Sequence, residues 1–221
     1  NDITTEPDSG TIYGNTFTDL NITVAGGGNV NLTRDYEFNK TIDEYPFQRG
    51  VRIQSDTIID GNGYHISSSW QNRAFYISNV NNVTLKNIKF QVTSSGYYKD
   101  GGTLYIQESS NITIINCTFS DCQAKYDGNG GAIYVKSTDP IRIIDSRFDE
   151  NSAGYGGAIT AHDATLILEN TTFYKNKANV IGAAVNAARS TLIINNSRFE
   201  EGEILADRKS GLAGMPRPIS Y

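Results

Sequence analysis

The sequence predicts an all-β fold: a single domain built as a parallel β-helix of about six coils. Three features of the 221-residue chain support this prediction. They are a repeat of 25–29 residues, a two-residue alternation of apolar side chains inside each repeat, and the near absence of helical periodicity. Because one such repeat cannot bury its apolar face alone, its copies must stack, and equivalent strands then pair in parallel from coil to coil.

Two motifs recur in each repeat. The first begins at a glycine and occurs as GGTLYI, GGAIYV, GGAITA and GAAVNA, at spacings of 29, 26 and 26 residues. The second ends in a phenylalanine, at spacings of 29, 29, 25 and 26 residues. The phenylalanines are Phe90, Phe119, Phe148, Phe173 and Phe199. Stacking superimposes equivalent positions, so we predict that these side chains form one interior column.

A sharp bend separates the strands of each coil. Apolar residues alternate, as in Ile112 and Ile114, until an Asn or Asp breaks the alternation. These two residue types tolerate the left-handed backbone conformation that a one-residue bend requires. The bend positions are Asn87, Asn116, Asp145, Asn170 and Asn196. We expect them to form a hydrogen-bonded ladder, in which Asp145 can accept a hydrogen bond but cannot donate one onward.

The coils are expected over residues 29–202. Residues 1–28 are expected to cap the first coil, because an open end exposes unpaired backbone. Residues 203–221 leave the repeat and contain two prolines, which suits a cap, a linker or a tail. The first residues, Asn-Asp-Ile, lack the charged and apolar regions of a secretory signal.

Composition argues against several classes of function. The net charge is −5 and basic residues do not cluster, which disfavours nucleic acid as a partner. No run approaches the ~20 apolar residues of a membrane span, so direct membrane insertion is not expected. With two His and two Cys, no metal site and no cofactor is predicted. Calcium at the DGN turns of residues 60–63 and 127–131 is a weaker alternative to ordinary turns.

The repeats resemble those of known surface proteins. The segment at 130–133 with Phe148 and Asn151, and that at 156–159 with Phe173 and Asn176, share a GGA[I/V] plus FxxN pattern. This pattern resembles the repeats of chlamydial polymorphic outer-membrane proteins and of adhesin-like surface proteins of methanogenic archaea. NLTRDYEF, TIIDGNGYHI and NNVTLKNIKF are similar to the archaeal group. The resemblance implies a right-handed β-helix at the cell surface with an adhesin-like role. The sequence departs from the glycine motif at Thr103-Leu104 and at Gly182-Ala183. It departs from the FxxN motif at Cys122 and Gly202, which replace the Asn after Phe.

The loops that precede the glycine pairs are the candidate binding site. They bring tyrosines and polar residues to the same side of consecutive coils, which suits sugar rings or a partner protein. The candidate ligand-binding residues are Tyr97, Tyr98, Lys99, Asp100, Tyr126, Asp127, Asn129 and Tyr155. The alternative is that these tyrosines only shield the edge of the coils.

We predict a binding module that presents a rigid face to glycans or surface proteins of other cells, with no catalytic residue assigned. One alternative is a polysaccharide lyase or glycoside hydrolase on the same scaffold. Asp149 and Glu200 share a register two coils apart, about 10 Å, at the edge of the range for inverting glycosidases. However, no His or Lys accompanies them, and a solvated face is favoured. A structural stalk is the second alternative.

Cysteines and glycosylation sequons leave further alternatives open. Cys117 and Cys122 lie five residues apart, and a short-range disulfide and two free thiols are about equally compatible with this spacing. The N-x-S/T sequons indicate either an N-glycosylated protein or strand composition. They begin at Asn21, Asn31, Asn39, Asn82, Asn111, Asn116, Asn170 and Asn195. Asn116 and Asn170 are expected to be buried because they occupy bend positions.

Overall fold

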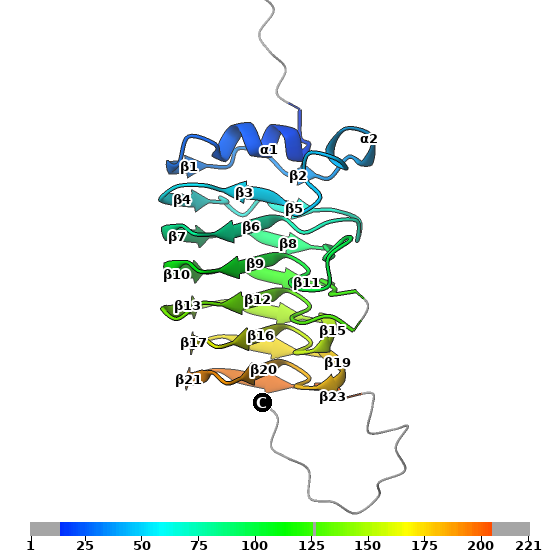
Figure 1. The fold of residues 1–221 in the computed structure, drawn as a ribbon, viewed down its shortest axis with the longest axis vertical. Helices are drawn as coiled ribbons and strands as arrows, with labels where there is room; N and C mark the ends of the chain where they lie inside the picture. The colour runs from blue at the N-terminus through cyan, green and yellow to red at the C-terminus, as the bar shows by residue number, and fades with distance from the viewer. Residues whose placement is uncertain (1–13, 126, 205–221) are drawn as a thin grey trace, which may run out of the picture.

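The structure is a computed structural model that describes residues 14–125 and 127–204. It confirms the predicted parallel β-helix, with about seven turns stacked along one axis (Figure 1). The sequence predicted about six turns. The strands of the first two turns carry neither of the two repeat motifs.

Three long sheets form the walls of the coils, and their neighbouring strands pair in parallel. The first sheet contains β1 (Gly28–Asn31), β4 (Thr57–Asp60), β7 (Asn81–Lys86), β10 (Ser110–Ile115), β13 (Pro140–Ile144), β17 (Thr165–Glu169) and β21 (Thr191–Asn195). The second contains β2 (Tyr36–Glu37), β5 (His65–Ser67), β8 (Lys89–Gln91), β11 (Thr118–Ser120), β14 (Arg147–Asp149), β18 (Thr172–Tyr174) and β22 (Arg198–Glu200). The third contains β3 (Val51–Ile53), β6 (Phe75–Ser78), β9 (Leu104–Gln107), β12 (Ile133–Lys136), β16 (Ile159–His162) and β20 (Val185–Ala188).

A fourth, short sheet lies at one corner of the C-terminal coils. It contains β15 (Ser152–Tyr155), β19 (Lys177–Ile181) and β23 (Glu203–Ile204). Lys177 pairs with Glu203, so the coil arrangement extends through Ile204 rather than ending at residue 202. The remainder of the predicted C-terminal cap, linker or tail lies outside the described residues.

Two helices cover the N-terminal end of the solenoid (Figure 1). Helix α1 (Phe17–Val24) begins at a capping box of Thr16 and Asp19 and buries Phe17 and Leu20 against the first coil. Helix α2 (Lys40–Asp43) ends at a buried aspartate, and the carboxylate of Asp43 accepts hydrogen bonds from the backbone N–H groups of Phe17 and Thr18, at 3.0 and 2.9 Å. The described part of the predicted N-terminal cap thus contains a helix, which the sequence pattern did not predict.

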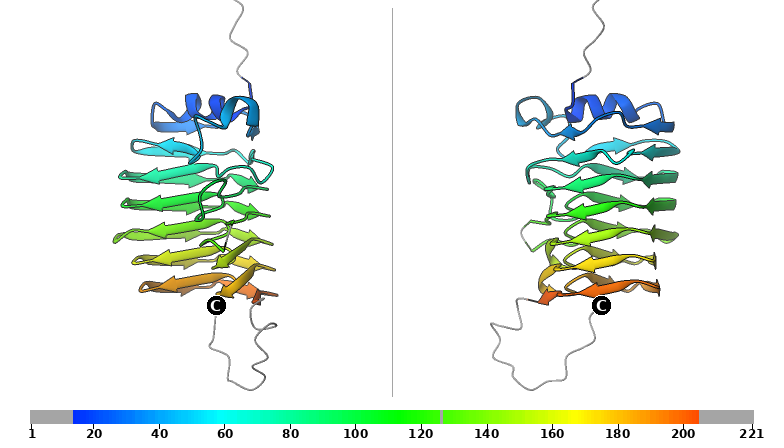
Figure 2. Two further views of the ribbon diagram at one scale, coloured as in Figure 1. Left: turned by 45° about the vertical axis from the view of Figure 1, so that its right-hand side comes forward. Right: turned by 180° about the vertical axis from the view of Figure 1, so that it is seen from behind.

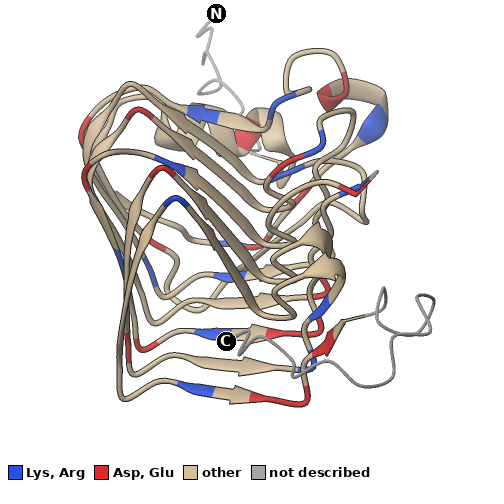
Figure 3. Ribbon diagram, turned by 60° about the horizontal axis from the view of Figure 1, so that its bottom comes forward, with Lys and Arg blue, Asp and Glu red and all other residues tan. Residues whose placement is uncertain are grey.

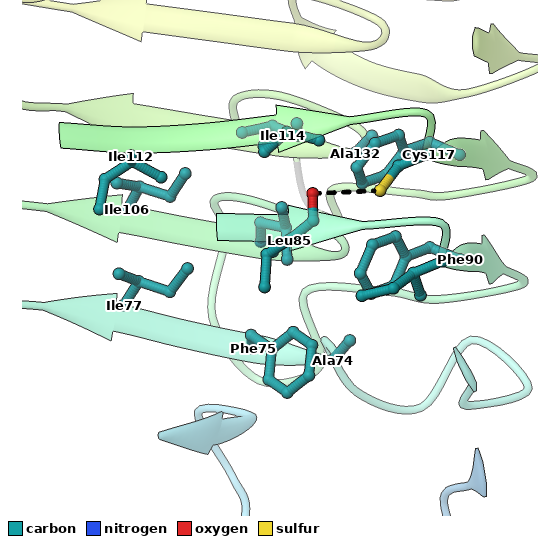
Figure 4. Close-up of a cluster of buried hydrophobic side chains, with 14 of the residues drawn as sticks. Ala74, Phe75, Ile77, Leu85, Phe90, Ile106, Ile112, Ile114, Cys117 and Ala132 are labelled. Carbon is teal, nitrogen blue, oxygen red and sulfur yellow. Dashed lines mark hydrogen bonds between the residues drawn. The ribbon is translucent and has the colours of Figure 1, made fainter. Parts of the chain in front are cut away.

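The predicted phenylalanine column lies inside the solenoid. Successive rings stack with centroids 4.6–4.9 Å apart, from Phe90 through Phe119, Phe148 and Phe173 to Phe199. Figure 4 shows Phe90 beside the Ile and Leu side chains of the other two walls, which complete the core. The ring spacing matches the ~4.8 Å separation of paired strands, because each ring is carried by a strand in register with the next.

The glycine pairs are required by two different constraints. The first glycine of each pair has a positive φ, for example 67° at Gly130, which other residues adopt only at a cost. The second approaches the backbone of the next coil so closely that a Cβ on Gly131 would clash with the carbonyl oxygen of Gly157. The last repeat has Ala183 in this place. The described chain ends two residues after Gly202, whose own added Cβ would meet the Cβ of Ala183 at 2.9 Å rather than a backbone atom.

The bend residues form the predicted ladder, and it is interrupted where expected. All five have positive φ values between 48° and 56°. The amide of Asn116 donates to the Oδ1 atom of Asn87 at 2.8 Å, and the amide of Asn170 donates to Asp145 at 2.6 Å. Asp145 accepts but has no proton to pass to Asn116. A second, buried ladder explains the FxxN motif, because the amide of Asn151 donates to Asn176 at 2.9 Å and to the carbonyl oxygen of Phe119 at 3.0 Å.

The phenylalanine column generates a stability prediction. Phe148→Ala should lower the free energy of unfolding by about 3–5 kcal/mol, because it removes a fully buried ring that contacts a stacked ring on both sides. Phe199→Ala is the matched control at the partly buried end of the column and should cost less. Urea unfolding followed by circular dichroism measures both. Equal losses would contradict a continuous interior column.

Candidate functional site

The loops between the second and third sheets form the candidate functional site. In the N-terminal coils the described parts of these connections are residues 44–50, 68–74, 92–103, 121–125 and 127–132, and we call the surface they form the loop face. Figure 1 shows the loop face on the right-hand side, and the left panel of Figure 2 brings it forward. In the C-terminal coils the short strands β15, β19 and β23 replace these loops, so the loop face is confined to the N-terminal half.

One hollow of the loop face is lined mainly by polar side chains. We call it the amide pocket; it has a volume of about 170 Å³, and its lining includes Lys40, Glu44, Gln48, Gln71, Tyr97 and Lys125. Tyr97 is 68% exposed, and its hydroxyl donates to the Oε1 atom of Glu44 at 2.7 Å. This hydrogen bond orients an accessible aromatic ring beside groups that can donate to and accept from hydroxyl groups.

A second hollow lies on the other side of the same loop. We call it the arginine pocket; it has a volume of about 240 Å³ and is lined by Arg49, Arg73, Tyr76, Tyr98, Lys99, Asp100 and Tyr105. The Arg73 side chain is 1% exposed, and its guanidinium lies 5.6 and 5.1 Å from the ring centroids of Tyr98 and Tyr105. Burial lowers the pKa of Arg73 to about 10, so this side chain stays charged at neutral pH.

The predicted ligand-binding residues do not form one continuous face. Tyr97 lines the amide pocket, while Tyr98, Lys99 and Asp100 line the arginine pocket. Asn129 supports the second group, because its backbone N–H and its side-chain amide both donate to the Oδ1 atom of Asp100, at 3.0 and 2.8 Å.

The remaining predicted residues lie further along the same corner. Asp127 accepts a hydrogen bond from the amide of Asn179 at 2.9 Å, and Tyr155 pairs with Asn129 through the backbone. Both therefore hold the corner together in the neighbouring coils. Tyr126 lies outside the described residues.

The third sheet carries an outward tyrosine stack that was not among the predicted residues. Tyr76, Tyr105 and Tyr134 occupy equivalent positions in β6, β9 and β12, with ring centroids 5.3 and 5.1 Å apart. A signal existed, since FYI, LYI and IYV place a tyrosine between two apolar residues in three successive repeats. Burial raises the pKa of Tyr134 to about 12, so the phenol remains neutral. No signal pointed to Arg73, which lies in a loop outside the repeat pattern.

Charged residues of both signs are interspersed around the coils (Figure 3). Asp149 and Glu200 do share a register with Tyr174 between them, as predicted. Each carboxylate forms an ion pair with an arginine of its own strand, Arg147 or Arg198, at 2.5 Å. Both carboxylates are therefore engaged by a guanidinium beside them on the outer surface of the second sheet.

A different group of carboxylates lies at the corner after the second sheet. Burial, together with the charges of Glu150 and Asp149, raises the pKa of Asp121. The indole N–H of Trp70 donates to the carbonyl oxygen of Asp121 at 2.9 Å, and the Trp70 side chain is 49% exposed. An acid with a raised pKa beside an accessible aromatic ring is compatible with sugar chemistry.

The DGN turn at Asp60 uses its carboxylate internally. The Oδ1 atom accepts hydrogen bonds from the backbone N–H of Asn62 at 3.0 Å and from the amide of Asn87 at 2.9 Å, while Lys86 pairs with Oδ2 at 3.0 Å. Within residues 14–125 and 127–204, no three His, Cys, Asp or Glu side chains gather as a metal site would require. The turn thus functions as the first rung of the bend ladder.

The sequons differ in how they use their amides. Asn116 and Asn170 are exposed, so the expectation that they are buried was wrong: the bend turns their side chains outward. Their amide nitrogens, which would carry a glycan, donate to the ladder. Asn82 and Asn111 also donate, to Asp56 and Asn82 respectively, both at 2.7 Å.

The other sequons lie outside these ladders. Asn21 is half-buried in α1, and the exposed residues are Asn31, Asn39 and Asn195. Asn39 accepts a hydrogen bond from Thr41 as the N-cap of α2, through its oxygen rather than its nitrogen. N-glycosylation stays a prediction for all of these sites.

The fold and the loop face together define a class of protein: a parallel β-helix whose coils form a rigid core and whose loops carry the pockets. Residues 2–164 and 49–212 match the family model described as right handed beta helix region. The chain belongs to this family, which confirms the β-helix implied by the resemblance of its repeats.

A solved structure supports the same fold. The chain is similar to a "putative glycosyl hydrolase" from Parabacteroides merdae ATCC 43184, with a TM-score of 0.56 and 11% identity, over 82% of this chain and 89% of that one. At this identity the similarity shows the fold alone. No curated protein matches the sequence. Among the described residues, no helix is both long and apolar enough to span a membrane.

Both cysteines are free thiols, so the alternative of a Cys117–Cys122 disulfide is not realised. The thiol of Cys117 faces the core and points to the carbonyl oxygen of Leu85 at 3.6 Å (Figure 4). Cys122 occupies the position held by Asn151 and Asn176 in the following coils, and its backbone N–H donates to the Oδ1 atom of Asn151 at 3.0 Å.

Thiol labelling tests this arrangement. Burial raises the pKa of Cys117 to about 12 and that of Cys122 to about 11, so both thiols stay protonated at pH 8. A thiol reagent should therefore label neither cysteine in the folded protein and both after unfolding in denaturant without reductant. Rapid labelling of the folded protein, or an intact mass lower by two hydrogens, would contradict the structure.

Proposed function

We propose that this β-helix is a carbohydrate-binding module displayed outside the cell, at its surface, and that the loop face binds glycans. The observation that carries the proposal is the exposed ring of Tyr97 on the wall of the amide pocket. Sugar rings pack their C–H faces on aromatic rings, while their hydroxyl groups exchange hydrogen bonds with amide and charged side chains. Gln48, Gln71 and Lys125 supply such groups around Tyr97.

A glycan suits this site better than a protein surface does. Protein interfaces commonly bury about 800 Å² on each partner around a core of large side chains. The loop face instead offers two small hollows of about 170 and 240 Å³ lined by polar and tyrosine side chains. The glycan of another cell is therefore the partner we favour. An adhesin-like role follows, in which the coils serve as a rigid mount and no catalysis is needed.

Substitution at the amide pocket tests the proposal. Tyr97→Ala should weaken binding at least about fivefold on a glycan array and in titration calorimetry with the best-bound glycan, since an aromatic platform contributes about 1–3 kcal/mol by analogy with other stacked rings. Tyr45→Ala is the matched control, because Tyr45 is 82% exposed and does not line the pocket. Binding that is unchanged in Tyr97→Ala would eliminate this site.

Glycan hydrolysis is the second candidate function, and Asp121 is the observation that favours it. Asp121 and Glu150 occupy equivalent positions of adjacent coils, which lie about 4.8 Å apart, close to the ~5 Å separation of carboxyls in retaining glycosidases. The raised pKa of Asp121 suits a general acid, and Trp70 provides a ring beside it. The name of the similar solved structure agrees with this alternative.

A reducing-sugar assay separates the two candidates. Under the binding proposal, glycans that bind the loop face should be recovered intact, and Asp121→Asn should leave their affinity within about twofold, the scale of an ordinary surface substitution. Asp139→Asn, at an exposed turn, is the control. Sugar release by the unmodified protein that is lost in Asp121→Asn and kept in Asp139→Asn would replace the binding module with an enzyme.

A further inference from the structure

Arg73 is a buried cation without a counter-charge in contact. Its side chain is 1% exposed, and among the described residues it forms no ion pair within 4.0 Å. Its Nη2 atom donates to the carbonyl oxygen of Ser95 at a long 3.4 Å, and its Nε atom is buried with no hydrogen-bond partner. A buried charge normally has a partner, because removing it from water costs several kcal/mol.

The chain holds this arginine in place from several sides. The rings of Tyr98 and Tyr105 lie near its guanidinium and partly offset the loss of water. Gly50, with a φ of 88°, makes room for its aliphatic stem, since a Cβ there would approach the Cγ atom of Arg73 to 2.7 Å. The site is thus preformed, and its cation lines a pocket open to solvent.

The charges around the pocket indicate which anion fits. Arg49 and Lys99 add positive charge at the same lining, and Arg49 is held by a 3.3 Å hydrogen bond from its Nε to the Tyr98 hydroxyl. Asp100 is the one carboxylate of the lining, and Asn129 fixes it through two hydrogen bonds. It opposes three positive side chains, so the lining keeps a net positive charge and favours an anion. A planar carboxylate also matches the geometry of a guanidinium.

We propose that the arginine pocket binds a carboxylate group and that the loop face therefore selects sugars that carry a ring carboxylate. This step rests on the proposed function, in which the adjacent amide pocket binds the neutral part of the same glycan. Tyr97 and Tyr98 are consecutive residues that line one pocket each, so a short oligosaccharide can contact both.

Titration of the unmodified protein tests the proposal without any substitution. Sodium glucuronate, glucuronamide, glucose and glucose 6-phosphate are titrated separately and followed by NMR and calorimetry. Glucuronate should bind at least about tenfold more tightly than glucuronamide, which has the same shape without the charge, and its binding should weaken as salt is added. Equal binding of glucuronate and glucuronamide would overturn the proposal.

Three variants locate the effect. Arg73→Lys keeps the charge but loses the planar fork and should weaken glucuronate binding at least about fivefold, whereas Asp100→Asn should strengthen it and improve binding of glucose 6-phosphate. Arg49→Gln, on the exposed rim, should weaken it less than Arg73→Lys does. Circular dichroism verifies that each variant is folded. If Arg73→Lys fails to fold, Asp100→Asn and the unmodified protein are compared instead. The same affinities for glucuronate and for glucose 6-phosphate in both proteins would contradict binding in the arginine pocket.

The outcomes also separate this proposal from the proposed function. Neutral glycans that bind through Tyr97, with no gain from a carboxylate, would overturn the carboxylate site and leave the binding module standing. If glucuronate binds and its binding depends on Arg73, but no glycan on the array binds, the carboxylate site is supported and the proposed glycan-binding function is overturned.

Discussion

Parallel pairing of equivalent residues in successive coils is the constraint on which the rest of this structure depends. Strands of the second sheet pair Phe119 with Phe148 and Phe148 with Phe173, so whatever side chain one coil places inward is met by the same type one coil later. Strand pairing sets a spacing of ~4.8 Å, and this is also a favourable distance for stacked aromatic rings. The backbone hydrogen bonds and the ring contacts therefore reinforce each other.

The same register explains why polar residues repeat as faithfully as apolar ones. An amide can accept from one neighbour and donate to the next, so Asn151 donates to Asn176 inside the coils and Asn116 donates to Asn87 at the outer bend. A carboxylate can take only the accepting role, and Asp60 accordingly forms the beginning of the outer ladder. Asp145 interrupts that ladder because its carboxylate cannot donate to the side-chain oxygen of Asn116. The bend is exposed, so water can donate to that oxygen instead.

Function is expected where this regularity stops. The C-terminal coils continue the stacking through β15, β19 and β23, while the N-terminal coils have loops without such strands in the same place, and these loops contribute to the two pockets. On the regular walls charges are matched locally, as in Arg147 with Asp149. The unmatched charge of Arg73 lies in a loop, behind two tyrosine rings, where stacking imposes no partner on it. A rigid core with adaptable loops is a common basis for recognition.

The sequence by itself determined the parts of this protein that repeat. The phenylalanine column, the left-handed bends, the glycine pairs and the interruption at Asp145 were all predictable, because each depends on contacts between equivalent residues 25–29 positions apart. The sequence also singled out Tyr97, Tyr98, Lys99 and Asp100, which line the two pockets, and their role in binding stays a prediction. The tertiary structure alone decided that Arg49 and Arg73 join them and that the Asn116 and Asn170 side chains turn outward. The physical reason is that loops of unequal length have no register, so their side chains meet only after the coils have been stacked.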